Sequence, residues 1–120
     1  MLAGRYSFLD RDAETLMSHA RARCMGPVLA GVYGSGILAA PKDGRHKFNF
    51  ADADPAIVGR VEALRADCDG HGVPLAAAIR FPMRHPATTA VVIGAKTAAW
   101  FDTDLPEAIW PDLDAALTSR

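Results

Sequence analysis

The sequence lacks the features that mark membrane-spanning, nucleic-acid-binding or secreted proteins. No apolar run approaches the roughly 20 residues of a membrane-spanning helix. The 13 Lys and Arg residues are scattered and are balanced by 14 Asp and Glu residues, so no basic surface for nucleic acid or an anionic membrane is indicated. The opening stretch MLAGRYSFLD has no long apolar core and no cleavage site, so we expect no signal peptide and a cytoplasmic location.

Cysteine and histidine are also sparse. With no secretion signal, we expect Cys24 and Cys68 to be reduced, partly buried thiols rather than a disulfide. No histidine pairs with another at i, i+4 or lies beside a Cys-x-x-Cys motif, so the sequence predicts no metal site. We expect His19 and His71 to face solvent or end helices, and His85, before Pro86, to have a structural role.

What is present is ordinary globular composition in a chain of 120 residues, half of them hydrophobic, which favours a single domain over 1–120. Short β-rich runs alternate with helical patterns, and this alternation predicts an α/β fold with parallel strands. The predicted strands are 2–9, 27–33 and 88–95, and the predicted helices are 13–24, 54–70, 74–81 and 105–117.

Two of the predicted helices carry specific signals. Asp12 is a candidate cap for the first, whose expected buried face is Leu16, Met17, Ala20 and Cys24. Asp54-Pro55 begins the second, with a buried stripe of Ile57, Val61, Leu64 and Cys68 and with Gly70 and Gly72 at its end. The helix over 74–81 is expected to stop before Pro82. The intervening loop, 34–53, is long enough to indicate a functional role.

The stretch GVYGSGILAA contains Gly34-Ser35-Gly36 followed by Ala39, which formally matches the dinucleotide-binding pattern G-x-G-x-x-A. That pattern requires a helix directly after the turn, and Pro41-Lys42-Asp43-Gly44 stops one. A nucleophile elbow around Ser35 also fails, because Tyr33 and Ile37 stand where glycines are needed. The glycines can still bring backbone N–H groups close to a phosphate in another fold.

The stretch VVIGAKTAAW places Lys96 and Thr97 just past the carboxyl end of the third predicted strand. Ligands of parallel α/β folds bind at the carboxyl ends of strands, and a lysine with a hydroxyl suits a phosphate. A solvated lysine in a turn explains the same residues equally well.

Taken together, AGRYSFLD, GVYGSGILA, ADPAIVGRVEALRADCDGHGVPLAAAIRFPMRHP, VVIGAKT and LPEAIWPDL resemble the C-terminal part of the aldo-keto reductase superfamily. The resemblance is strongest to its aldose dehydrogenases, similar to L-fucose (D-threo-aldose) dehydrogenase and pyridoxal dehydrogenase. It implies three C-terminal βα units of a TIM (β/α)8 barrel, in which the strands would be the sixth, seventh and eighth. It also implies hydride transfer between NAD or NADP and an aldose or aldehyde.

By the same resemblance, the cofactor pyrophosphate would lie along Val32, Tyr33, Gly34, Ser35 and Gly36. The adenosine ribose or its 2′-phosphate would lie at Gly94, Ala95, Lys96 and Thr97. The family's catalytic Asp, Tyr, Lys and His belong to the first half of the barrel, which has no counterpart here. We therefore expect no catalytic residues in this chain and no activity from it alone. The alternative is a non-enzymatic nucleotide-binding or self-associating half-barrel.

Overall fold

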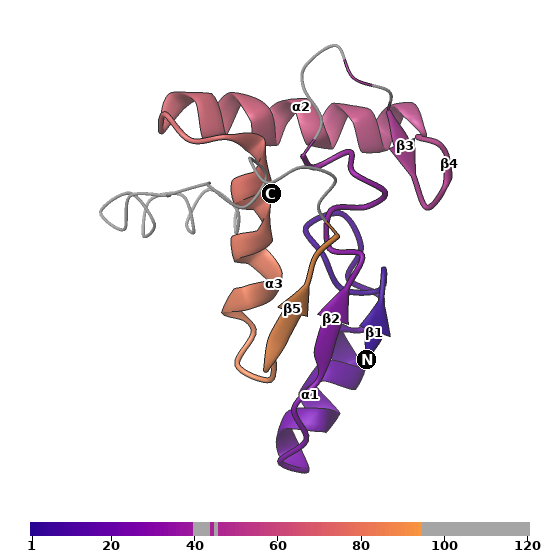
Figure 1. The fold of residues 1–120 in the computed structure, drawn as a ribbon, viewed down its shortest axis with the longest axis vertical. Coiled ribbons are helices and arrows are strands. Elements are labelled where there is room, and N and C mark those ends of the chain that lie inside the picture. Colours follow the sequence, from indigo (N-terminus) through magenta and orange to yellow (C-terminus); the bar gives the residue numbers. More distant parts are fainter. Residues whose placement is uncertain (40–43, 45, 95–120) are drawn as a thin grey trace.

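The computed structural model describes residues 1–39, 44 and 46–94, and it shows a three-stranded sheet with helices around it (Figure 1). The sheet order is β1-β2-β5, and a separate hairpin pairs β3 with β4. The strands are β1 (Leu2–Ala3), β2 (Val28–Ala30), β3 (Lys47–Phe48), β4 (Ala51–Asp52) and β5 (Ala90–Val92). The helices are α1 (Glu14–Ala22), α2 (Pro55–Gly70), the short 3-10 helix η1 (Leu75–Ile79) and α3 (Arg80–Arg84).

The three strands of the sheet run parallel, which confirms the predicted α/β class. Leu29 of the central strand pairs with Leu2 on one side and with Val91 on the other, and its side chain is fully buried. Because the strands are parallel, their carboxyl ends share one edge of the sheet, and α2 and the β3–β4 hairpin lie beyond that edge (Figure 1).

The strands are shorter than the sequence predicted. β1 ends at Ala3 instead of residue 9, because Gly4 turns the chain with φ of +65°. Beyond it the Ser7 hydroxyl accepts hydrogen bonds from the N–H groups of Leu9 and Asp10, which form a turn in place of a strand. β2 likewise ends before Gly31, whose φ is +67°. The prediction of long strands over 2–9 and 27–33 was therefore wrong in length.

α2 forms as predicted. The Asp54 carboxylate accepts a hydrogen bond from the Ala56 N–H at 2.8 Å, and Pro55 occupies the first turn. Val61, Leu64 and Cys68 are buried along one face. At the other end Gly72 adopts φ of +68°, and the Val73 N–H donates to the Cys68 carbonyl at 3.0 Å. Such a glycine-based stop satisfies carbonyls that the helix leaves unpaired.

α1 differs from its prediction in its cap and its face. Ala13 occupies the N-cap position without a side-chain hydrogen bond, and Asp12 instead pairs with Arg5 at 3.5 Å. Met17 and Ala20 are buried as expected. Leu16 is 52% exposed and Cys24 is exposed, so both were wrongly assigned to the buried face. Cys24 follows the helix with φ of 54°, which turns the chain away from the helical stripe.

The segment after α2 also differs from the prediction of a helix over 74–81. A 3-10 helix continues into α3, and Pro82 lies inside α3 rather than beyond it. Proline is tolerated there because residue 82 falls in the first turn of α3, where a backbone N–H needs no helical partner. The helix predicted over 105–117 lies outside the described residues.

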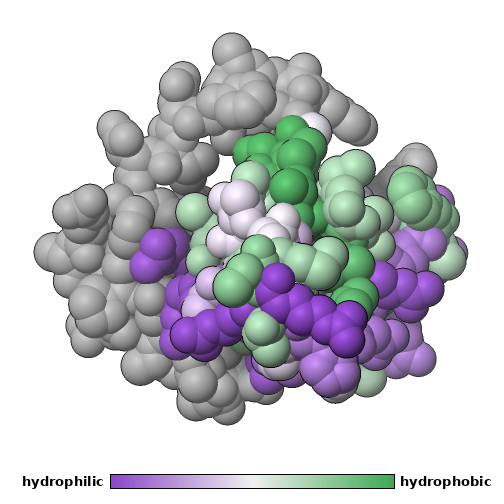
Figure 2. All heavy atoms as spheres, turned by 90° about the horizontal axis from the view of Figure 1, so that it is seen from below, coloured by the Kyte–Doolittle hydropathy of each residue, from purple (hydrophilic) through white to green (hydrophobic). Residues whose placement is uncertain are grey.

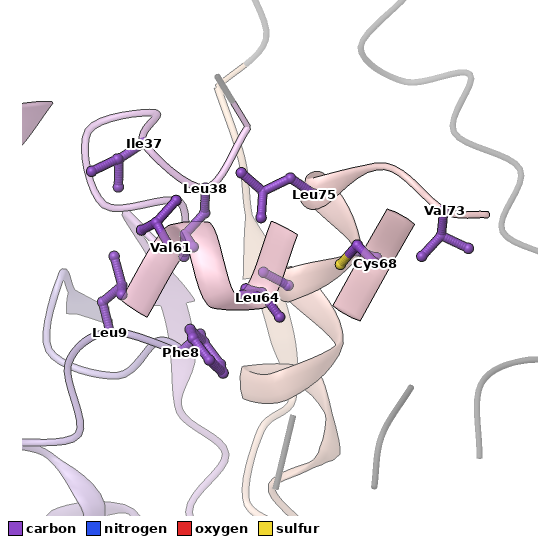
Figure 3. Packing of buried hydrophobic residues seen from close by; sticks show 11 residues of the cluster. Phe8, Leu9, Ile37, Leu38, Val61, Leu64, Cys68, Val73 and Leu75 are labelled. Atoms are coloured by element: carbon purple, nitrogen blue, oxygen red, sulfur yellow. The ribbon is translucent and has the colours of Figure 1, made fainter. Parts of the chain in front are cut away.

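The buried side chains form two hydrophobic clusters. The first packs the inner face of α2 against the segments that follow β1 and β2, with Phe8, Leu38 and Leu64 fully buried (Figure 3). The second lies between the sheet and α1 and includes Met17 and Leu29. Cys68 belongs to the first cluster, where burial raises the pKa of its thiol to about 11. Both cysteines are free thiols, as expected, although Cys24 is exposed.

Apolar side chains also remain open to solvent around the amino ends of the strands. Met1, Leu16 and Met25 are more than half exposed, and they line an apolar hollow of about 230 Å³. From below, hydrophobic residues form a band in the middle of the view, and hydrophilic residues border it below and on the right (Figure 2). Among residues 1–39, 44 and 46–94, none of the helices combines the length and the apolar character required to cross a bilayer.

Candidate functional site

The carboxyl edge of the sheet is built from glycines. Gly4 follows β1 and Gly31 follows β2, and both have positive φ. The Gly4 N–H donates to the Ala30 carbonyl at 2.9 Å. A Cβ atom at Gly31 would lie 3.1 Å from the Gly4 nitrogen, so the two strand ends approach closely only because Gly31 has no side chain. This close approach leaves main chain exposed at the edge where ligands of α/β sheets bind.

Residues 31–39 form a series of turns. The N–H groups of Gly34 and Gly36 donate to the carbonyls of Gly31 and Tyr33, both at 3.0 Å. Gly34, Ser35 and Gly36 have φ of 54°, 60° and 92° in succession. No helix opens directly after the turn in the described residues up to 39, so the helix terminus that a dinucleotide-binding fingerprint requires is missing there.

The β3–β4 hairpin covers this turn, and the sequence prediction of an unstructured loop over 34–53 missed it. The Ser35 hydroxyl accepts a hydrogen bond from the Phe50 N–H at 2.9 Å. Phe48 packs on Gly34 so closely that a Cβ atom there would lie 2.9 Å from its ring. The local signal for the hairpin in KFNFAD is Asn49, a residue type that tolerates the positive φ of a two-residue turn.

Two hollows lie side by side along this edge, and we call them together the edge groove. They share Gly31, Ser35 and Phe50. The larger, about 470 Å³, is completed by Ala3, Gly4, Arg5 and Asn49. The smaller, about 360 Å³, is completed by Val32, Tyr33, Gly36, Val92, Ile93 and Gly94. Val32, Tyr33, Ser35 and Gly36 follow β2 and Gly94 follows β5, and the parallel pairing of these strands brings the five residues to one cavity.

The predicted cofactor residues have different surroundings in this groove. Val32 is buried, Ser35 is exposed, and Gly36 is half-buried with nothing within 4 Å of a Cβ position. Gly34 lies beneath Phe48, where it forms part of the turn and does not line the groove. Gly94 lines the groove. Ala95, Lys96 and Thr97 lie outside the described residues.

Tyr33 connects the groove to the helical layer. Its hydroxyl donates a hydrogen bond to the Ala76 carbonyl at 3.2 Å. Burial raises the pKa of this phenol, so it is neutral at pH 7. Arg5 supplies a positive charge on the groove wall and forms an exposed ion pair with Asp12. The groove therefore combines main-chain polarity, two aromatic side chains and a cation, which suits a ligand carrying both an anion and a flat ring.

A separate polar hollow of about 450 Å³ lies between α1 and α3. His85 Nδ1 accepts from the Ala87 N–H at 3.1 Å, and His85 Nε2 lies 3.6 Å from Glu14 Oε1. Burial, followed by the hydrogen bond and charge of Glu14, raises the pKa of Tyr6 to about 12. These contacts tie α1 to α3, which agrees with the structural role expected of His85.

His71 and His19 lie on or at the end of helices and do not line this hollow. His71 ends α2, and its Nδ1 lies 2.8 Å from the Asp67 carbonyl. His19 is exposed on α1, so both helical histidines lie as the sequence predicted. Within the part of the chain that the structure describes, no group of three His, Cys, Asp or Glu residues is placed to hold a metal ion.

Comparison with known proteins identifies one informative similarity. The chain is 43% identical over 122 residues to pyridoxal 4-dehydrogenase of Microbacterium luteolum, a match that covers 94% of this chain and 36% of the relative. The chain thus spans little more than a third of the length of the curated relative. This match confirms the resemblance inferred from the motifs. No family model matches the sequence, and no solved structure matches it.

Proposed function

We propose that this chain carries the cofactor-binding part of an oxidoreductase similar to the aldo-keto reductases. In the whole enzyme, hydride would pass between NAD or NADP and an aldose or aldehyde. The observation that carries the proposal is the edge groove, where Ser35 and Gly36 meet Gly94 at the carboxyl ends of parallel strands. The 43% identity to a dehydrogenase supports the same assignment.

The residues of the groove fit a cofactor pyrophosphate. Positive φ at Gly36 and the open space around it let a phosphate approach the main chain without a steric clash. Ser35 and Gly36 would hold the pyrophosphate, with Arg5 nearby as a positive charge. Gly94, with Ala95, Lys96 and Thr97, would hold the ribose. The bound cofactor supplies the hydride, and the role of these residues is to hold and orient it.

We further propose that the chain is inactive alone and that its three strands belong to a larger (β/α)8 barrel. Polarising a carbonyl requires an acid near the nicotinamide, and the tyrosines described here do not fit that role. The Tyr33 hydroxyl already donates a hydrogen bond to the Ala76 carbonyl. Tyr6 is buried beside Glu14, and its pKa is raised to about 12. Catalytic groups would therefore come from a complementary part of a longer protein.

The test is a calorimetric titration of the purified chain with NADPH and NADH. We expect saturable binding of at least one of them at millimolar concentration or below. Lys96→Ala should weaken NADPH more than NADH, because only NADPH has a 2′-phosphate for the lysine to meet. Lys47→Ala, a lysine of the β3–β4 hairpin, is the matched control and should leave the ratio of the two affinities unchanged. A folded chain that binds neither cofactor would contradict the proposal.

A second candidate function, self-association, is favoured by the apolar residues around the sheet. Met1, Leu16 and Met25 are exposed near the amino ends of β1 and β2, and Val92 is 52% exposed on β5. Such edges invite pairing with another strand or another chain. A second copy or a complementary piece would cover them. Sedimentation velocity at several concentrations distinguishes an associating chain from a monomer.

A further inference from the structure

Phe50 combines two unfavourable features at one position. It is 92% exposed, the highest value among the exposed large hydrophobic residues described. Its φ is 67°, in the left-handed region that bulky side chains rarely adopt. A single exposed apolar residue needs no explanation, and neither does a single strained turn. Both together at the tip of a hairpin, where glycine is the favoured residue, point to a role for the side chain.

The tip that presents Phe50 is held in place. Its N–H donates to the Ser35 hydroxyl, and the neighbouring Phe48 is seated on Gly34. Ladder pairs join Phe48 to Ala51 and Lys47 to Asp52 on either side of the turn. The main chain of Phe50 is thus fixed to the same glycine turn that we assign to the pyrophosphate.

The position of Phe50 in the groove matches that of a stacking surface. It lines both hollows of the edge groove, and the wall that they share is otherwise Gly31 and Ser35. The other aromatic residue on this wall, Tyr33, is half-buried and committed to the Ala76 carbonyl. A ligand whose phosphate lies on the Ser35–Gly36 turn would therefore bring its adjoining ring within reach of the Phe50 face.

We infer that Phe50 is an aromatic platform that stacks on a flat heteroaromatic ring of the ligand bound in the edge groove. This inference rests on the proposed function, and it names the chemistry that the groove recognises beside phosphate. The ring is either the nicotinamide or the adenine of the cofactor, since both present the same kind of π-face. Stacking on an aromatic side chain accounts for about 5- to 150-fold in affinity per base.

The experiment measures the affinity of the chain for three probes: nicotinamide mononucleotide, adenosine diphosphate and inorganic pyrophosphate. Phe50→Leu keeps an apolar side chain but removes the ring. It should weaken the binding of either nicotinamide mononucleotide or adenosine diphosphate by about 5- to 150-fold. Pyrophosphate affinity should change by less than about 2-fold, because it offers no ring to stack. The probe that loses affinity identifies the ring. Phe50→Tyr should retain binding, and Met83→Leu, an exposed residue of α3, is the control.

A second variant separates ligand recognition from folding. Phe50→Gly relieves the positive φ, so its melting temperature should rise by about 4 °C or more while ring affinity falls as in Phe50→Leu. A lower melting temperature would assign Phe50 to the fold and overturn the inference. The inference would also be overturned if the Phe50 variants bound both ring-bearing probes with unchanged affinity. It would equally be overturned if they lost as much affinity for pyrophosphate as for the ring-bearing probes. In both cases binding by the native chain would still support the phosphate site. If the native chain binds none of the three probes, the inference and the proposed function both fall.

Discussion

The segments that follow β1 and β2 begin alike and then differ over residues 6–9 of the first and residues 35–36 of the second. Each leaves the same edge of the sheet through a glycine of positive φ, Gly4 or Gly31. Residues 6–9 then turn inward and are buried without exception. In the second segment Ser35 is exposed and supports a hairpin beside an open groove, whereas Gly34 is buried and Ile37 and Leu38 return to the core. Of two loops at one edge of the sheet, the first therefore packs into the core, and the second leaves main chain exposed at the groove where we propose that the cofactor binds.

Side-chain size explains the division. Tyr6, Phe8 and Leu9 bring enough apolar surface to enter the two core clusters. The carbonyls of Phe8 and Leu9 accept hydrogen bonds from Arg60, at 2.9 Å and 3.0 Å. A Gly-Ser-Gly sequence has no such surface to bury, so nothing draws it into the core.

The largest expected effect comes from Phe8→Ala in the inward segment. Phe8 is fully buried between α2 and Phe81, so its truncation should lower the free energy of unfolding by about 3–5 kcal/mol. Phe50→Ala makes the same kind of substitution in the β3–β4 hairpin and should change the free energy of unfolding by less than about 0.5 kcal/mol. Urea denaturation measures both. Similar losses for the two variants would contradict the division between the segments.

Alkaline pH should destabilise the inward segment through Tyr6. Its pKa is about 12 in the folded chain and 10.0 when unperturbed, so the unfolded state ionises first as pH rises. The stability that the neutral phenol provides is complete below pH 10 and is lost by pH 12, up to about 3 kcal/mol. Tyr6→Phe should remove this part of the alkaline loss and leave the parts due to Tyr33 and Cys68, whose pKa values are also raised. Equal alkaline losses in the native chain and the variant would argue against a buried neutral Tyr6.

A smaller effect is expected from Gly34→Ala in the segment after β2. The new Cβ would lie 2.9 Å from the Phe48 ring at φ of 54°, so the hairpin must shift. We expect a loss of about 1–2 kcal/mol from the left-handed conformation and weaker cofactor binding. Gly59→Ala, within α2 and with nothing near its Cβ, should instead stabilise the chain by about 0.5–1 kcal/mol. Thermal denaturation of both variants tests the contrast.

Local signals made part of this fold predictable. The boundaries of α2 followed from Asp54-Pro55 at its start and Gly72 beyond its end, because caps and stops act within a few residues. The strand ends did not follow, because Gly4 and Gly31 take positive φ only where two strands approach closely. Leu16 was misplaced because periodicity shows that a face is apolar but not what covers it.

The candidate site was predictable in its residues more than in its shape. The glycine turn and Gly94 were identified from the sequence, and the parallel sheet brings them to one cavity. The hairpin that carries Phe50 was missed, because two-residue strands are too short to show alternation. The role of Ser35 as an anchor for that hairpin depends on a contact across 15 residues, which no local pattern encodes.

The most direct test of the account is a residue-resolved NMR titration of the amide groups with NADPH. The account predicts saturable shifts at Gly31, Ser35, Gly36 and Gly94 that follow one binding curve. The amide signals of residues 6–9, in the buried segment after β1, should show no change in chemical shift. Shifts confined to the hollow between α1 and α3, or no saturable shift in residues 31–36, would contradict it.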